Sequence, residues 1–451
     1  MKTEKIGVKA VDILLPSEGI DFYKWAVIAC DQYTSQPEYW KRVFDIVGDN
    51  YSTLKLIFPE VFLDEEEKKK DERIDKINKT MKNYLNNNIL VNHKSSMIYL
   101  ERKNSHSVSR KGLIFAVDLE KYDYNKGSQT FIRATEGTVL DRIPPRLKVR
   151  ENAAIELPHI MLLIDDLERS VIEPIGLILK ELEKVYDTDL MMNGGHITGY
   201  QINQEKIINQ ILSRLRKLTD RDIFNKKYGV DEKYGILLFA TGDGNHSLAT
   251  AKAHWERIKI GLSTDDKKSH PSRFALVEVV NIHDKGLTFE PIHRIVFGVD
   301  SKKMLENMKE YLYKNGSKTE IIFCGSKDKM KDEISRLNNK DAHIISFVFN
   351  GGYGFMIIKN PIFNLEVGTL QNYLDQFIEG KPNVKIDYVH GKKIVNKIGS
   401  KENNIGFYLP VMDKKDLFKT VIVDGSLPRK TFSMGEAEEK RFYFESRKII
   451  K

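Results

Sequence analysis

The chain has 451 residues, of which 41% are hydrophobic and 30% are charged. This composition is typical of folded globular proteins and excludes a wholly disordered chain, and the length predicts two or three domains. No apolar run approaches the roughly 18 residues of a membrane helix, and the first residues lack the apolar stretch of a secretory signal. The only two cysteines, Cys30 and Cys324, are too few for a disulfide framework. We therefore expect a cytoplasmic protein that has no membrane partner.

The net charge is +8, from 72 basic and 64 acidic residues. Charges of both signs alternate, as in the segment Asp64–Arg73, and no stripe of Lys and Arg with interleaved aromatic residues occurs. Such a stripe is the usual footprint of a nucleic-acid-binding surface, so we expect no DNA partner. A moderate positive surplus suits a small anionic or phosphorylated metabolite, or a nucleotide.

The first two thirds of the sequence predict helices and strands in alternation. Pro37 favours a helix start before residues 38–44, because proline is tolerated in the first turn. Hydrophobic periodicity predicts the remaining elements. The predicted helices span residues 65–85, 175–182, 205–218 and 247–258, and the predicted strands span residues 96–101, 112–119, 235–240, 274–282 and 292–296.

The last third predicts a smaller domain or an insertion. A helix over residues 301–312 is followed by a strand over residues 320–324 and a helix from Asp328. Asn350 and Gly351 then separate two strand patterns, which is a strong hairpin signal. The predicted class is α+β (mixed α/β). The predicted divisions are an N-terminal α/β region at 1–120, a core region at 121–300, a smaller domain or insertion at 301–385, and a segment at 386–451 that packs back on the core.

The most informative segment runs from Ala240 to Ala251, where an apolar strand ends at a glycine-containing turn and a helix begins. The free N–H groups and positive dipole end of a helix N-terminus favour a phosphate or carboxylate. Gly242 and Gly244 allow a close approach of the backbone, with Asn245 and Ser247 beside it. Asp243 suits a base or a magnesium ligand, and His246 suits a hydrogen bond to a phosphate oxygen.

Other polar residues at loops and strand ends are candidates for the same site. Asp31 follows an apolar strand pattern, where a general base or metal ligand commonly lies. Arginine forks bind phosphate with two parallel hydrogen bonds, and a loop-rich segment supplies Arg133 and Arg146 together with Glu136. Further candidates are His293, Arg294, Arg429 and Lys430. No His or Cys spacing fits zinc, so magnesium held through Asp243 is the one metal expected, alongside ADP or ATP.

Several motifs resemble the DUF1015 family along essentially the whole chain. They are the strand–DGNHS–helix junction at 243–247 and the segments Val11–Pro16, Trp25–Trp40 and Pro428–Gly435. The usual family pattern at the junction is DGHHR, and here Asn245 replaces the first histidine and Ser247 replaces the arginine. That pattern is similar to the loop of free-serine kinases built on a ParB/sulfiredoxin-like core, in which the helix N-terminus holds nucleotide phosphates. The resemblance implies that Arg133, Arg146 or Arg294 replaces the missing arginine.

These observations favour a small-molecule phosphoryl-transfer enzyme, with free serine as the acceptor that the resemblance implies. Phosphoryl transfer depends chiefly on positioning and charge stabilisation, which this set of residues supplies. In that mechanism Asp31 or Asp243 takes the proton of the acceptor, and Arg133 acts on the same ligand as Asp243. Three alternatives remain open at this point. They are a phosphatase acting on a phosphorylated amino acid, a ParB-like nucleotide-binding regulator without catalysis, and a structural protein.

Overall fold

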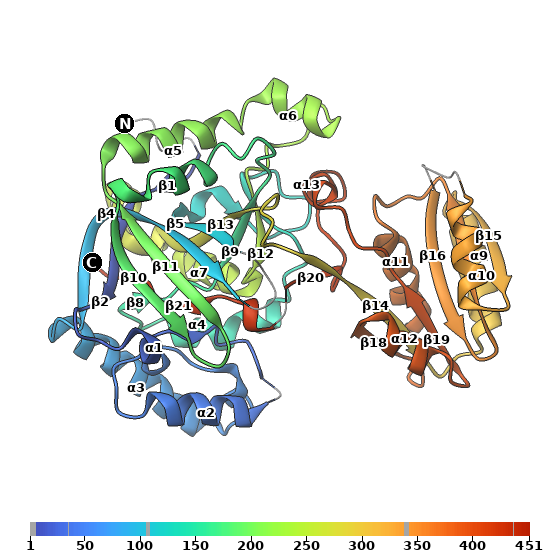
Figure 1. The fold of residues 1–451 in the computed structure, drawn as a ribbon, viewed down its shortest axis with the longest axis horizontal. Coiled ribbons are helices and arrows are strands. Elements are labelled where there is room, and N and C mark those ends of the chain that lie inside the picture. Colours follow the sequence, from blue (N-terminus) through green and yellow to red (C-terminus); the bar gives the residue numbers. More distant parts are fainter. Residues whose placement is uncertain (1–5, 35, 105–108, 338–341, 436) are drawn as a thin grey trace. The chain divides into compact units, whose positions relative to one another are not determined.

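The computed structural model describes residues 6–34, 36–104, 109–337, 342–435 and 437–451, which form two units (Figure 1). The first unit comprises the chain up to Thr288 and again from Gly435, and the second unit is the segment Phe289–Met434. The second unit is therefore inserted between the main part of the first unit and its last strands. Both units combine helices with strands, which confirms the predicted α+β class.

The predicted domain boundaries at residues 120, 300 and 385 differ from those of the structure, in which the second unit begins at Phe289 and ends at Met434. Strand β5 (Arg110–Asp118) pairs with β13 (Phe274–Asn281), so the regions on either side of residue 120 share one sheet. Strand β14 (Phe289–Phe297) pairs with β18 (Lys385–His390) and β19 (Asn404–Tyr408). The chain after residue 385 thus completes the second sheet, and only its end, from Gly435, returns to the first unit.

A mixed sheet of eleven strands forms the centre of the first unit, in the order β10-β11-β4-β5-β13-β9-β12-β7-β6, with β1 added to β5 and β2 to β4. Strand β12 runs parallel to β7 and antiparallel to β9. The other strands of this sheet are β1 (Val8–Lys9), β2 (Val11–Pro16), β4 (Leu90–Lys103), β6 (Tyr122–Asp123), β7 (Ile132–Ala134), β9 (Met161–Ile164), β10 (Glu183–Leu190), β11 (Gly195–Ile202) and β12 (Phe239–Asp243). Two small ladders, β21 (Phe442–Tyr443) with β3 (Val27–Ile28) and β22 (Arg447–Lys448) with β8 (Ile155–Glu156), attach the end of the chain.

Both faces of this sheet are buried. Successive side chains of a strand point to opposite faces, and on β5 Ile114 belongs to one apolar cluster while Phe115 belongs to the other. Figure 1 shows α1, α2 and α3 (blue) on one side of the unit and α5 and α6 (green) on the other. The helices of this unit are α1 (Phe22–Trp25), α2 (Pro37–Val47), α3 (Glu67–Asn86), α4 (Ile143–Arg150), α5 (Glu205–Lys217), α6 (Arg221–Tyr228), α7 (Asn245–Ile258) and α8 (Thr264–Ser269).

The second unit has its own sheet, in the order β15-β17-β16-β19-β14-β18, with β20 paired to β14. The predicted hairpin at Asn350 and Gly351 is confirmed, because it joins β16 to β17 in an antiparallel register. The remaining elements are β15 (Lys318–Cys324), β16 (Ala342–Phe349), β17 (Gly352–Lys359), β20 (Phe432–Met434), α9 (Ser301–Lys314), α10 (Lys327–Ser335), α11 (Glu366–Ile378), α12 (Lys392–Gly399) and α13 (Lys414–Val423).

One predicted helix is wrong, and one predicted strand begins later than expected. Residues 175–182 form short 3-10 turns that lead into β10, because their N–H groups donate to carbonyls three residues back, as Ile178 does to Ile175. The strand predicted at 235–240 begins only at Phe239, since the N–H groups of Leu238 and Phe239 both donate to the carbonyl of Phe131.

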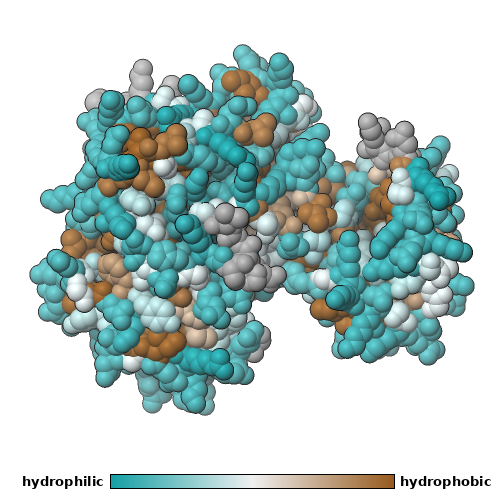
Figure 2. Space-filling model, in the orientation of Figure 1, coloured by the Kyte–Doolittle hydropathy of each residue, from teal (hydrophilic) through white to brown (hydrophobic). Residues whose placement is uncertain are grey.

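The surface seen in Figure 2 is mainly hydrophilic, with apolar side chains in scattered groups. Within the ranges described above, none of the helices combines the length and apolar character that a membrane span requires.

Candidate active site

The predicted strand–turn–helix junction is present, and its geometry requires a glycine. Strand β12 ends at Asp243, α7 begins at Asn245, and Gly244 between them has a φ of 75°. A Cβ at Gly244 would lie 3.0 Å from the Cα of Ile160, so a side chain would meet both backbone strain and a steric clash. Gly242 lies at an irregularity of β12, between Thr241, which pairs with Leu162, and Asp243, which pairs with Met161. No side chain of the described residues caps α7, which leaves its positive dipole end open to an anion.

Asp243 is held by a lysine from the end of the chain. The Nζ atom of Lys440 lies 3.2 Å from Oδ2 of Asp243, while Oδ1 accepts a hydrogen bond from the N–H of Gly244 at 2.9 Å. Lys440 is brought there because Tyr443 on β21 pairs with Val27 on β3. The C-terminal segment therefore runs beside the strand that leads to Asp31.

Asp31 is a half-buried carboxylate with cationic side chains around it. Burial raises the pKa of Asp31. The electrostatic effects of His159, Lys440 and Arg146 and the hydrogen bond that Gln32 donates outweigh burial, so the pKa of Asp31 lies below its usual value. Asp31 is therefore ionised at neutral pH.

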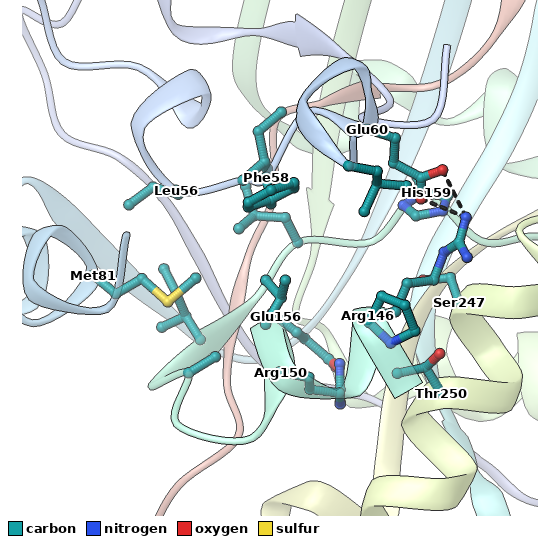
Figure 3. Close-up of a pocket in the computed structure, with 17 residues that line it drawn as sticks. Leu56, Phe58, Glu60, Met81, Arg146, Arg150, Glu156, His159, Ser247 and Thr250 are labelled. Atoms are coloured by element: carbon teal, nitrogen blue, oxygen red, sulfur yellow. Dashed lines mark hydrogen bonds and ion pairs between the residues drawn. The ribbon is translucent and has the colours of Figure 1, made fainter. Parts of the chain in front are cut away.

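A second carboxylate, Glu60, forms an ion pair with Arg146 of α4. Oε1 of Glu60 lies 2.5 Å from Nη2 of Arg146, and Figure 3 shows the two side chains meeting beside His159 and Ser247. Burial raises the pKa of Glu60; Arg146 opposes this shift, and the nearby charge of Asp31 adds to it. Two carboxyl groups with opposite shifts thus share one site, which is a common arrangement at functional sites.

Tyr443 connects the two halves of the site. Its hydroxyl lies 2.8 Å from Nδ1 of His159 and accepts a hydrogen bond from the N–H of Cys30 at 3.1 Å. Burial, together with Asp31 and Glu60, raises the pKa of the Cys30 thiol, so Cys30 is not a thiolate nucleophile at neutral pH.

His246 is neutral in this environment. Burial first, and then Arg146 and Arg142, lower its pKa to about 4, so the imidazole supplies no positive charge at neutral pH. Its Nε2 accepts a hydrogen bond from the N–H of Val139 at 3.3 Å, which leaves Nδ1–H as the donor. Next to it, Oδ1 of Asn245 is buried with no hydrogen-bond partner among the described residues.

Arg133 does not reach this cluster, which corrects the expectation that it shares a ligand with Asp243. Its guanidinium donates to the carbonyl oxygens of Thr130 at 2.9 Å and Gly235 at 2.6 Å. Gly235 precedes the first residue of β12, whereas the turn at Gly244 follows the last residue of that strand, so the guanidinium of Arg133 lies toward the other end of β12. Burial lowers the pKa of Arg133 to about 10. The arginine at the junction is Arg146, which the sequence placed among the candidates.

The remaining candidates lie elsewhere. Glu136 is half-buried on the loop after β7. His293, Arg294, Arg429 and Lys430 belong to the second unit. His293 accepts from the N–H of Leu409 at 3.1 Å, and Arg294 donates to Gln371 at 3.2 Å, both inside that unit. Arg429 pairs with Asp375 at 2.6 Å, and Lys430 is exposed.

The residues offer a metal only a partial fit. The described ranges contain no group of three His, Cys, Asp or Glu side chains arranged to hold an ion. Asp243, the predicted magnesium ligand, already has Lys440 as its cationic partner. Magnesium commonly binds through one or two carboxylates plus substrate phosphates, and at Asp243 it would share the carboxylate with Lys440 and the N–H of Gly244.

Sequence reasoning missed four residues of the cluster, namely Glu60, His159, Lys440 and Tyr443. His159 begins the apolar run at residues 159–164, and a polar residue at the start of a buried strand could have indicated a functional position. The other three have no local signal, because tertiary pairing brings them together.

The profile of a family described as "Protein of unknown function (DUF1015)" matches residues 14–377. No curated protein matches the sequence. Among solved structures, a free serine kinase in complex with AMP is similar at a TM-score of 0.37 and 12% identity, over 78% of this chain and 95% of that chain. A conserved hypothetical protein from Pyrococcus furiosus gives a TM-score of 0.34 at 12% identity, over 77% and 97% of the two chains. SbnI with a C-terminal truncation, from Staphylococcus aureus, gives 0.34 at 9% identity, over 71% and 82%.

Proposed function

We propose, from the premise that this chain belongs to the DUF1015 family, that it is a phosphoryl-transfer enzyme acting on a small hydroxyl-bearing metabolite. The observation that carries the proposal is an ionised carboxylate, Asp31, that lies near the cations Lys440 and Arg146 and the imidazole of His159. The N-terminus of α7 lies close to Asp31. Asp31 acts electrostatically on His246 in the first turn of α7, and Lys440, which lowers the pKa of Asp31, also pairs with Asp243 just before this helix.

In the proposed reaction each group has a distinct role. The acceptor oxygen forms a bond to the terminal phosphorus of a nucleotide, and the bond from that phosphorus to the bridging oxygen breaks, with the electron pair leaving on the bridging oxygen. Asp31 accepts the proton of the acceptor hydroxyl. The α7 N-terminus and Nδ1–H of His246 bind phosphate oxygens, and Arg146 and Lys440 offset the charge that develops.

ADP or ATP is the proposed phosphoryl donor, and serine is the first acceptor to test. Water in place of the hydroxyl would make the same site a phosphatase for O-phosphoserine. Assays distinguish the kinase from the phosphatase. A kinase consumes serine together with a nucleotide, whereas a phosphatase consumes O-phosphoserine without a nucleotide.

The test is a thermal-shift screen against ADP, ATP, CTP, serine and O-phosphoserine, with and without magnesium, followed by turnover assays on the ligands that bind. A ligand that binds only the folded protein raises its unfolding temperature. We expect Asp31→Asn to keep nucleotide binding and to lose about a hundredfold or more in kcat, in the range of general-base removal. The control is Asp45→Asn, which changes an exposed carboxylate on α2. A screen in which no nucleotide or phosphate compound shifts the unfolding temperature would refute the proposal.

A further inference from the structure

A cavity of about 130 Å³ lies directly beside the charged cluster. Its lining combines two kinds of wall (Figure 3). Glu60, Arg146, His159 and Ser247 lie together on one side of the view, and Leu56 and Met81 lie on the other. Most of the remaining lining is apolar, from Ile57, Phe58, Leu63, Pro145, Val149, Ala153, Ile155 and Leu157.

The charged residues of the lining are already paired. Arg146 pairs with Glu60 at 2.5 Å, and Arg150 pairs with Glu156 at 2.5 Å. Thr250 donates its hydroxyl hydrogen to the carbonyl of His246 at 2.7 Å. Nε of Arg150 is the one side-chain donor of the lining that is buried without a partner in the described part of the chain. The cavity therefore suits a group that is mostly hydrocarbon and carries at most one hydrogen-bond acceptor.

The size of the cavity sets the size of this group. An apolar cavity of about 150 Å³ inside a protein stays dry and is large enough to bind benzene. The present cavity is close to that volume, so it accommodates a phenyl ring or a branched chain of about five carbons. Serine has a single methylene group in its side chain and would leave most of this space empty.

We propose that this cavity is a specificity pocket for an apolar substituent of the phosphoryl acceptor. The proposal rests on the proposed function, because it is the hydroxyl or phosphate of the same molecule that contacts Arg146 and α7. The substrate class is thus a small hydroxy compound, or its phosphate ester, that carries a phenyl-sized or branched aliphatic group next to the reacting oxygen.

The test compares methyl phosphate with 3-methylbutyl phosphate by isothermal titration calorimetry. Each buried methylene contributes about 0.8 kcal/mol, so we expect the longer ester to bind at least about tenfold more tightly. Ala153→Leu places three more carbon atoms in the cavity and should abolish this preference while leaving methyl phosphate unaffected. Ala342→Leu adds the same atoms to β16 of the second unit and should keep the preference.

A second variant tests the pocket by enlarging it. Met81→Ala removes a side chain from the apolar wall, so it should favour heptyl phosphate over 3-methylbutyl phosphate relative to the unmodified protein. Equal binding of the short and long esters, or a preference that survives Ala153→Leu, would overturn the pocket while the proposed function stands. Absence of binding by every phosphate ester would overturn the proposed function, and the pocket proposal with it.

Discussion

Nζ of Lys440 lies 3.2 Å from Oδ2 of Asp243, and this contact joins the last segment of the chain to the loop at the start of α7. Both groups are largely buried, with side-chain exposures of 17% and 26%. The same lysine lowers the pKa of Asp31. One cation thus acts on two carboxylates that come from different parts of the first unit.

Replacing this cation should impair the reaction more than the fold. We expect Lys440→Met to lower kcat/KM by about a hundredfold, in the range found when one transition-state donor is removed. The measurement is steady-state kinetics with the phosphoryl donor that the ligand screen identifies. Lys448→Met, which changes an exposed lysine of the same segment, should have no effect. Equal activity of both variants would remove Lys440 from the site.

The backbone at Gly244 gives a second prediction. Gly244→Val combines a φ of 75° with a Cβ placed 3.0 Å from the Cα of Ile160 and 3.3 Å from Cδ2 of His159, so it should abolish phosphate binding. Gly229→Val is the matched control, since Gly229 has a φ of 65° with no atom within 4 Å of the added Cβ. Both variants should lose about 1–2 kcal/mol of stability from the strained backbone. Titration calorimetry with phosphate should then separate them, and unchanged binding by Gly244→Val would show that the loop does not hold the anion.

The two arginines that the sequence placed at one site should behave differently. Arg146→Ala removes the partner of Glu60 and should lower kcat by about a hundredfold. Arg133→Ala leaves the carbonyls of Thr130 and Gly235 without their donor, so it should lower the free energy of unfolding by about 1–3 kcal/mol and leave KM and kcat unchanged. Kinetics and urea unfolding on both variants measure the difference. Loss of kcat in stable Arg133→Ala protein would return Arg133 to the site.

Buried histidines should make the fold sensitive to mild acid. Burial lowers the pKa of His246, His254, His293 and His343 to about 4, against a usual value of about 6.5 in the unfolded chain. Between pH 4 and pH 6.5 the unfolded chain binds more protons than the folded chain. The free energy of unfolding is therefore highest above pH 6.5 and falls as the pH drops toward 4.

Each of His254, His293 and His343, which are buried, lowers the free energy of unfolding by up to about 1.4 kcal/mol per pH unit in this window. His293→Gln, which keeps an acceptor for the N–H of Leu409, should therefore have a shallower decline than the unmodified protein. The measurement is chemical unfolding at several pH values between 7.5 and 5. Identical slopes for the two proteins would contradict the assignment for His293.

A buried ionic network anchors the segment that carries Lys440. Arg441 pairs with Glu278 at 2.6 Å and with Glu445 at 2.5 Å, and all three side chains are at most 3% exposed. Glu278→Gln removes one of the two carboxylates that face Arg441 and the carboxylate that faces Arg110. It should therefore cost about 3–5 kcal/mol in the free energy of unfolding. Asp265→Asn, in an exposed pair with Lys268, should cost less than about 1 kcal/mol. A loss below 1 kcal/mol for Glu278→Gln would show that the network is not required for the fold.

Local chemistry explains what could be predicted from the sequence. The junction at Gly244 and the hairpin at Asn350 each depend on a few adjacent residues, so their patterns identified them. The direction of the Arg133 side chain depends instead on the carbonyl of Gly235, which the chain brings near through a separate loop. Lys440 and Tyr443 reach the site through the pairing of β21 with β3, and no spacing in the sequence encodes that contact.

The order of the chain also determines when the site can become complete. Lys440 and Tyr443 follow the whole second unit in the sequence, so a ribosome makes them only after all the other residues of the cluster. The main sheet has all eleven of its strands by then, but Asp243 and His159 still lack their partners. A nascent chain, or a product of premature termination before residue 440, would therefore have most of the first unit without a competent site.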